Sequence, residues 1–259
     1  MRTLAIVNQK GGVRKTTTAV TLAHGLVHLH KRVLLVDLDA QGNCADALGI
    51  GKKGSLHAFV AQKAGRKAVS TTGRRGLDVV TSDKSTVQLK SELIGMMFRE
   101  KRLAQALETV AGGYDVCVLD VAPGVDILQV GALIACTHFI IPVALSKLAV
   151  VGAGDALAST AALKQAGEFR GQFLGVLPTF WDQRVKENTY QLKTLAAQFK
   201  ELVWPPIPVD AKAGEAPSYG QTLWEYAPKC RALQGSSYKG KVVGGYCAVL
   251  RRLVGVLDG

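Results

Sequence analysis

The chain has 259 residues, of which 48% are apolar and 20% charged, and its formal net charge is +12. This length suits one large α/β domain or two smaller ones, with enough apolar residues for a sizeable core. No run of about 18 uninterrupted apolar residues occurs, so no transmembrane helix is expected. A strand is expected to begin within three residues of the N-terminus, which leaves no room for a signal peptide. The five cysteines form no Cys-x-x-Cys pair, which favours free thiols over zinc or iron–sulfur sites.

The most specific pattern connects the first predicted strand to the first predicted helix. Residues 4–7 are apolar, residues 16–30 have a helical pattern, and residues 10–17 read Lys-Gly-Gly-Val-Arg-Lys-Thr-Thr. A strand, a glycine-rich loop with Lys-Thr and a helix form a phosphate-binding loop, whose backbone N–H groups and helix N-terminus face phosphates. In such a loop Lys15 would reach the β- and γ-phosphates, and the Thr16 hydroxyl would bind Mg²⁺.

Carboxylates end two further predicted strands. Residues 33–36 are apolar and lead into Asp37 and Asp39, and residues 116–119 lead in the same way into Asp120. Open α/β sheets bind their ligands at the carboxyl ends of the strands, and Mg²⁺ takes one or two carboxylates together with water. Without a phosphate loop upstream, aspartates in these places would more often be capping groups. The loop at residues 10–17 therefore favours a functional interpretation.

The rest of the chain alternates predicted strands with predicted helices. We expect strands near residues 3–8, 33–37, 77–81, 116–120, 138–143, 173–178 and 203–207, and helices over 16–30, 103–110, 149–165 and 188–202. Residues 51–76 are interpreted as an irregular, partly helical surface segment. The alternation predicts a doubly wound, mostly parallel α/β sheet flanked by helices. Because the strand-end motifs need one continuous sheet, we expect a single domain over residues 1–259.

These motifs resemble those of the ParA/MinD family of deviant Walker A ATPases, which have a P-loop fold. The family loop reads Lys-Gly-Gly-x-Gly-Lys-Thr-Thr, and residues 10–17 match it except at Arg14. Residues 37–43 resemble its Asp-x-Asp-Pro-Gln-Gly-Asn except at Ala40, and Asp120 and Pro123 match its Asp-x-x-Pro. Residues 182–184 and 212–220 resemble two later motifs. Since no helix-turn-helix extension precedes the loop, the chain is most similar to the short ParA (Soj-type) form.

The resemblance implies that ATP and Mg²⁺ are cofactors and that ATP is hydrolysed to ADP and phosphate. It implies that Lys10 crosses an ATP-bound dimer, that Asp39 orients the attacking water, and that Thr16, Asp37 and Asp120 surround Mg²⁺. The implied catalytic residues are Lys10, Lys15 and Asp39. The implied nucleotide-binding residues are Lys10, Gly11, Gly12, Val13, Arg14, Lys15, Thr16, Thr17, Pro206 and Pro208.

Arg14 stands where the motif has glycine. Glycine tolerates positive φ and lets the chain approach phosphate, whereas the Cβ of arginine disfavours φ > 0. The side chain would swing outward toward a dimer partner, or inward, where it would pair with phosphate or with Asp39 or Asp120. We expect Arg14 to weaken ATP binding and to impair hydrolysis relative to Arg14→Gly.

Positive charge is concentrated in one stretch, since residues 51–103 hold twelve Lys and Arg against four Asp and Glu, a local charge of +8. A basic patch is the footprint of a nucleic-acid or anionic-membrane surface, although it also arises as a solvated face that aids solubility. The resemblance implies a homodimer that binds DNA without sequence preference, a ParB-like partner that stimulates hydrolysis, and a cytoplasmic, nucleoid-associated role in plasmid or chromosome partition. The candidate DNA-binding residues are Arg184 and Lys212, with Arg251 and Arg252 as further candidates.

Two other functions remain open from the sequence. A membrane-cycling ATPase of the MinD type would need a C-terminal amphipathic helix on lipid, and residues 246–257 are apolar with two arginines. The same tail is what a terminal helix packed on the domain would look like, and it lacks Trp and Phe. A nucleotide-poor adaptor that retains the fold is the other alternative, and Arg14 is the reason to keep it.

Overall fold

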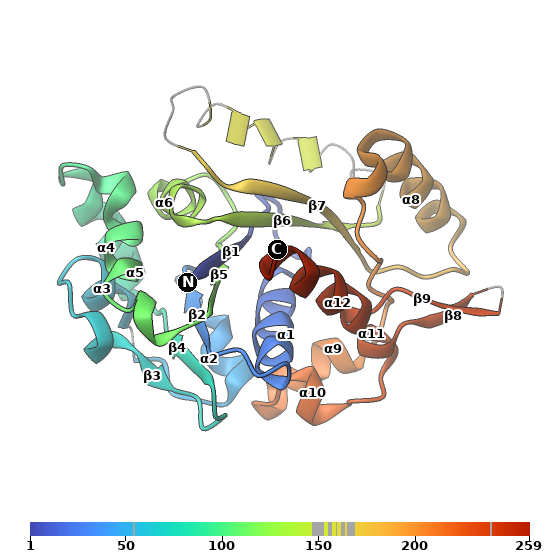
Figure 1. Ribbon diagram of the computed structural model, residues 1–259, viewed down its shortest axis with the longest axis horizontal. Helices are drawn as coiled ribbons and strands as arrows, with labels where there is room; N and C mark the ends of the chain where they lie inside the picture. The colour runs from blue at the N-terminus through green and yellow to red at the C-terminus, as the bar shows by residue number, and fades with distance from the viewer. Residues whose placement is uncertain are drawn as a thin grey trace.

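A seven-stranded sheet forms the centre of the molecule (Figure 1). The computed structural model describes residues 1–53, 55–146, 153–154, 157–158, 160–161, 164, 169–238 and 240–259. The strands are β1 (Arg2–Ile6), β2 (Val33–Asp37), β3 (Ser70–Thr71), β4 (Leu77–Val80), β5 (Val116–Asp120), β6 (His138–Ala144) and β7 (Gln172–Thr179), in the order β3-β4-β2-β5-β1-β6-β7. All neighbouring pairs are parallel except β3 and β4. The predicted doubly wound, mostly parallel sheet is confirmed.

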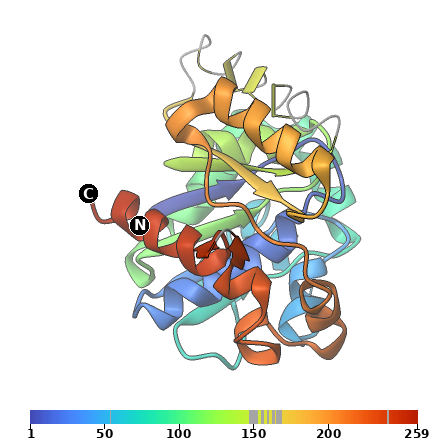
Figure 2. The same ribbon diagram turned by 90° about the vertical axis from the view of Figure 1, so that its right-hand side faces the viewer.

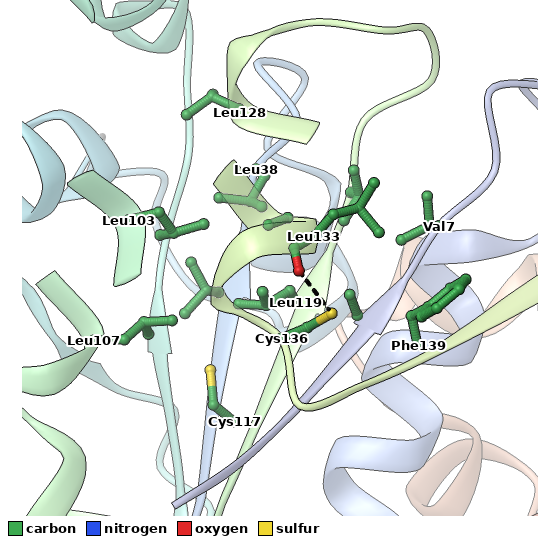
Figure 3. Close-up of a cluster of buried hydrophobic side chains, with 14 of the residues drawn as sticks. Val7, Leu38, Leu103, Leu107, Cys117, Leu119, Leu128, Leu133, Cys136 and Phe139 are labelled. Atoms are coloured by element: carbon green, nitrogen blue, oxygen red, sulfur yellow. Dashed lines mark hydrogen bonds between the residues drawn. The ribbon is translucent and has the colours of Figure 1, made fainter. Parts of the chain in front are cut away.

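Helices cover both faces of this sheet, because alternate residues of each strand point to opposite sides. On one face Leu34 and Val36 pack with α3 (Ser55–Val60), α4 (Ser85–Ile94), α5 (Arg102–Glu108), α6 (Ile127–Ala135) and α8 (Lys186–Phe199). Figure 3 shows part of this cluster, including Leu119 of β5, Leu133 of α6 and Phe139 of β6. On the other face Val33 and Leu35 pack with α1 (Lys15–His28), α2 (Asn43–Leu48), α9 (Lys212–Glu215), α10 (Leu223–Tyr226), α11 (Arg231–Gln234) and α12 (Tyr246–Leu257).

The expected strand at residues 203–207 is wrong. Its residues run beside β7 but make only isolated bridges, between Val176 and Val203 and between Trp181 and Pro208. Pro205, Pro206 and Pro208 lack backbone N–H groups, so the segment cannot form a continuous ladder. The sequence also missed a small hairpin of β8 (Ser236–Tyr238) and β9 (Lys241–Val243).

Residues 51–76 are partly helical, as expected, but they are not only a surface segment. Leu56 and Phe59 of α3 are fully buried, because α3 closes the core over β4 and α5. Most of the helix expected over 149–165 lies outside the described residues. Three of the other expected helices are present, as α1, α5 and α8.

The C-terminal helix α12 packs on the domain beside α1 (Figure 2). Its apolar residues Val249, Leu250 and Leu253 are buried, and the buried Tyr246 hydroxyl lies 2.9 Å from the Thr18 hydroxyl of α1. The apolar face that a lipid-binding helix would need is therefore already part of the core. No helix in the described part of the chain is long and apolar enough to cross a bilayer.

A buried histidine joins α1 to the C-terminal third. His24 Nδ1 lies 2.8 Å from the Thr222 hydroxyl, and only 6% of the histidine is exposed. Burial, together with the nearby His28, lowers the pKa of His24 from 6.5 to about 4. The neutral ring is therefore the form that stabilises the fold.

The fold should lose stability as the pH falls, and His24→Asn should reduce that loss. Because the folded pKa lies below the unfolded value, the stabilisation is fully present above pH 6.5 and is lost as the pH falls toward 4. We expect His24 to account for up to about 3 kcal/mol of the loss across this window. Urea unfolding of both proteins at pH 7 and pH 4.5 measures it, and equal losses in the two would contradict this role.

Candidate functional site

The phosphate loop and the strand-end carboxylates meet at one edge of the sheet. Strands β1, β5 and β2 are neighbours, and Asp120 is in register with both Ile6 and Asp37. The loop that follows β1 therefore begins at the level where the two carboxylates end their strands. This is the carboxyl edge, where open α/β sheets bind ligands.

The loop is anchored at its start and open at its glycines. The Asn8 side chain donates to the Pro142 carbonyl at 2.7 Å and accepts from the Lys10 N–H at 2.9 Å. Gly12 has φ of 72°, and beyond the chain neighbours no described atom lies within 4 Å of the place where a Cβ on Gly11 or Gly12 would sit. The glycines therefore leave free space in front of the helix N-terminus, as a bound phosphate requires.

The two lysines of the loop have different environments. Lys15 is 7% exposed and its ammonium donates to the Lys10 carbonyl at 2.9 Å, across the loop. Burial lowers the pKa of Lys15, while Asp120 and Asp39 oppose that effect. The Lys10 ammonium is exposed and makes no ion pair or hydrogen bond within the described structure. Lys15 thus faces the site, and Lys10 is available to a second molecule.

Two buried carboxylates lie beside the loop. Asp37 accepts from the N–H groups of Asp39 and Cys44, both at 3.0 Å. Asp120 accepts from the Cys44 thiol at 3.4 Å through Oδ2, while its buried Oδ1 has no hydrogen-bond partner among the residues that the structure describes.

Burial dominates the electrostatics of this pair. It raises the pKa of Asp37, and the neighbouring Asp120 raises it further. It also raises the pKa of Asp120, although the nearby Thr16 hydroxyl, the Cys44 thiol and the charge of Lys15 counteract this. A cation would relieve both carboxylates, and the unpartnered Asp120 Oδ1 beside Thr16 is suited to a Mg²⁺ ion or its water.

The turn within the motif at residues 37–43 needs glycine. Gly42 has φ of 66°, and a Cβ there would lie 2.5 Å from the Ser82 carbonyl oxygen. Through this turn the half-buried Asp39 accepts from the Gln41 N–H at 3.0 Å with Oδ1. Asp39 therefore stands at the edge of the site, in contact with solvent, unlike Asp37 and Asp120.

Arg14 adopts the left-handed conformation, with φ of 67° and ψ of 34°. Its guanidinium stacks over the Phe180 ring, 4.3 Å from the centroid, and donates to the Asp210 carbonyl at 3.3 Å. Its Nη1 is buried, with no hydrogen-bond partner in the described part of the chain. One expected alternative, in which the side chain pairs with Asp39 or Asp120, is therefore not observed. The side chain turns instead toward the segment that contains Pro206 and Pro208.

A cavity of 840 Å³ opens beside the N-terminus of α1. Thr16 and Thr17 line it from one side, α2 from another, and residues 217–220 from a third. Pro206 and Pro208, which the sequence predicts to contact nucleotide, do not line this cavity but lie buried beside the end of β7. The Pro-Ser-Tyr-Gly segment at 217–220 was recognisable as a family motif, but its position over the loop follows only from the fold.

The predicted DNA-binding residues differ in how free they are. Arg184 pairs with Asp182 at 2.7 Å, and Lys212 pairs with Glu215 at 2.8 Å, all near the surface. Arg252 stacks over Trp204 and donates to the carbonyls of Val203 and Glu201, so it holds the loop after α8. Arg251 is exposed, with no hydrogen bond or ion pair to the described residues. Of the four, Arg251 is the one whose charge no described residue compensates.

Part of the basic stretch at 51–103 is also neutralised. Arg66 pairs with Asp78, Arg74 with Glu225, Lys52 with Asp46, and Lys90 with Asp126, each at 2.5–2.8 Å. The exposed residues Lys53, Lys63, Lys67 and Arg75 carry the remaining surface charge of residues 51–76.

Comparison with known proteins agrees with this geometry. The sequence profile of the AAA domain family matches residues 1–170. The sporulation initiation inhibitor protein Soj of Bacillus subtilis is 33% identical over 236 residues, covering 89% of this chain and 93% of Soj. The chain belongs to the ParA/MinD family. Family membership makes this a P-loop ATPase fold and places the chain among the ParA/Soj partitioning ATPases.

Two further relatives extend the comparison. The chromosome partitioning protein ParA of Caulobacter vibrioides is 33% identical over 241 residues, covering 90% of each chain. A solved structure described as cobyrinic acid a,c-diamide synthase of Mycobacterium smegmatis, with a bound ATP analogue and magnesium, is 32% identical. It superimposes with a TM-score of 0.75 and covers 85% of this chain and 91% of its own. Nucleotide and Mg²⁺ thus bind a related P-loop fold.

Replacing Asp120 by asparagine should stabilise the ligand-free protein while removing the carboxylate. Because the folded pKa of Asp120 is raised, its charged form destabilises the fold increasingly as the pH rises above 3.8. At pH 7.5, in EDTA, Asp120→Asn should increase the free energy of unfolding by about 1–2 kcal/mol. Denaturant unfolding measures this, and the difference should shrink toward pH 4. Asp39→Asn, at the half-buried carboxylate, is the control and should change stability by less than about 0.5 kcal/mol; equal effects would contradict the burial argument.

Proposed function

We propose that this chain is a ParA-type ATPase that binds Mg·ATP at residues 10–17. The observation that carries the proposal is the unpartnered Asp120 Oδ1, buried beside Thr16 and Lys15 where the loop meets the sheet. A buried acceptor left without a hydrogen bond is costly in a ligand-free fold unless a ligand completes it. We propose that residues 1–259 act as a single P-loop domain in this role.

Each residue around the site has a role that its contacts support. Lys15 exchanges the Lys10 carbonyl for the β- and γ-phosphates, and the N–H groups of residues 11–17 cradle them. Thr16, Asp37 and Asp120 would hold Mg²⁺, which neutralises charge on the transferred phosphoryl group when bound. Asp39, which reaches solvent, orients the attacking water. Positioning and charge neutralisation carry most of such a reaction.

The partners follow from the exposed groups and from the family. Lys10, exposed at the mouth of the loop, crosses to the phosphates of a second copy in an ATP-bound homodimer. The dimer binds DNA without sequence preference, and a ParB-like protein stimulates hydrolysis to release it. The names of the relatives support partition or positioning of DNA as the process. On this proposal the protein is cytoplasmic and associated with the nucleoid.

Arg14 sets how well the loop works. The left-handed backbone of a residue with a Cβ costs about 1–3 kcal/mol, and the guanidinium is directed at residues 206–210, the segment proposed to contact nucleotide. We expect Arg14→Gly to bind Mg·ATP about tenfold more tightly than the unsubstituted chain, and to hydrolyse it faster.

Isothermal titration calorimetry with Mg·ATP tests this, with Arg14→Ala as the matched control. Alanine removes the guanidinium but keeps the Cβ, so recovery in both variants assigns the obstacle to the side chain, and recovery in glycine alone assigns it to the backbone. Unchanged affinity in Arg14→Gly would contradict the role of Arg14. Absence of binding by all three proteins would sink the ATPase proposal and favour an adaptor with an ATPase fold.

DNA binding should depend on Arg251 more than on its neighbour. Arg251→Ala should weaken binding uniformly across sequences and reduce the slope of log affinity against log salt by about 1. Arg252→Ala should instead lower the free energy of unfolding by about 1–2 kcal/mol, because its guanidinium bonds backbone carbonyls over Trp204. Fluorescence anisotropy with random DNA duplexes at several salt concentrations measures the affinity and its salt dependence. Equal DNA affinity in Arg251→Ala and the unsubstituted chain would show that Arg251 does not contribute to DNA binding.

A MinD-like membrane cycle is the alternative, and the packing of α12 argues against it. Binding lipid through this helix would expose Val249, Leu250 and Leu253 and would break the Tyr246–Thr18 hydrogen bond. Fully burying one such aliphatic side chain is worth about 1.5–3 kcal/mol, so undocking the helix is expensive.

A further inference from the structure

The fold brings a thiol into the pair of buried carboxylates. Cys44 Sγ lies 3.4 Å from Asp120 Oδ2, and Asp37, Cys44 and Asp120 each offer a ligand atom within 4.8 Å of the others. All three side chains are at most 1% exposed. The cluster also contains the buried Asp120 Oδ1, an acceptor with no hydrogen-bond partner among the described residues.

The atoms suit a soft or borderline divalent cation. In a tetrahedral site with metal–sulfur and metal–oxygen bonds of about 2.3 and 2.0 Å, the sulfur and oxygen atoms lie about 3.5 Å apart. Cys44 Sγ and Asp120 Oδ2 are already at that separation, 3.4 Å. A shift of about 1–1.5 Å by Asp37 would bring the third atom to the spacing that such a site requires. A water molecule would serve as the fourth ligand.

The sulfur atom distinguishes this site from a magnesium site. Mg²⁺ takes hard oxygen ligands in octahedral geometry and has no affinity for a thiolate, whereas Zn²⁺ and Cd²⁺ bind cysteine and carboxylate together. Among the described cysteines Cys44 alone sits with two carboxylates in such a cluster. Cys117 and Cys136 pack in the apolar core on the other face of the sheet, as Figure 3 shows, where Cys136 donates to the Leu133 carbonyl.

We propose that Asp37, Cys44 and Asp120 form a site for a thiophilic divalent cation, Zn²⁺ or Cd²⁺, which binds the nucleotide-free protein. On binding, the Cys44 thiol loses its proton to solvent and a metal–sulfur bond forms, while Asp37 and Asp120 each contribute an oxygen. The ion replaces the thiol–carboxylate hydrogen bond at Asp120 Oδ2, and its bound water donates to the orphaned Asp120 Oδ1. Because Asp120 is then occupied, Zn²⁺ inhibits any activity that requires Mg²⁺ at the same carboxylate.

The test uses Cd²⁺ as the probe, because its thiolate bond produces an ultraviolet charge-transfer band. The full chain, stripped with EDTA and free of nucleotide, is titrated in a Cys230→Ser/Cys247→Ser background, which removes the two half-exposed thiols. We expect one Cd²⁺ per chain, with the band present. Cys44→Ala should abolish the band, and Asp120→Asn should weaken binding by at least about tenfold.

Cys117→Ala is the matched control, since it removes an equally buried thiol that lies away from the carboxylates. It should keep both the band and the stoichiometry. A band that persists in Cys44→Ala, or that Cys117→Ala removes, would overturn the site, as would the absence of Cd²⁺ binding in the serine background. If Cys44→Ala does not fold, Asp37→Asn and Asp120→Asn decide: unchanged Cd²⁺ affinity in both overturns the proposal. Because the titration contains no nucleotide, its outcome is independent of whether the chain hydrolyses ATP.

Discussion

Two aspartates are buried side by side at the ends of β2 and β5, and the groups around them are arranged to compensate their charge. Asp37 and Asp120 are in register on neighbouring strands and almost completely buried, so each raises the cost of ionising the other. Lys15, the backbone N–H groups of Asp39 and Cys44, and the Cys44 thiol partly compensate. One oxygen of Asp120 has no hydrogen-bond partner among the described residues, and the Mg²⁺ ion proposed above would compensate its charge. Stability and function oppose each other at this point.

The loop depends on the far end of the chain as much as on its own glycines. Arg14 contacts Phe180 and Asp210, Thr18 contacts Tyr246, and His24 contacts Thr222. Helix α1, whose N-terminus would face the phosphates, is therefore held by residues about 200 positions later. Arg14 thus connects the phosphate loop to the segment at residues 206–210, and its backbone is left-handed.

The net charge of this protein does not show which cations are available to a ligand, because many of them form ion pairs. The sequence has a net charge of +12, but four of its cations form ion pairs with neighbouring carboxylates: Arg66, Arg74, Lys52 and Lys90. Arg252 stacks over Trp204, whereas the adjacent Arg251 is exposed and forms no hydrogen bond or ion pair with the described residues. Since exposed unpaired cations contribute most to phosphate binding, adjacent arginines are expected to act differently.

The sequence alone determined the parallel α/β fold and the phosphate loop, because both depend on local patterns: apolar strands, helical periodicity, and glycines before Lys-Thr. It failed at 203–207, where prolines remove the hydrogen-bond donors that a strand needs. Asp37 and Asp120 were found because each ends an apolar strand. Cys44 was missed: a lone cysteine carries no spacing signal, and only the pairing of β2 with β5 puts its thiol against Asp120. The same holds for Arg14, whose left-handed backbone was foreseeable but whose partners, Phe180 and Asp210, are set by long-range packing.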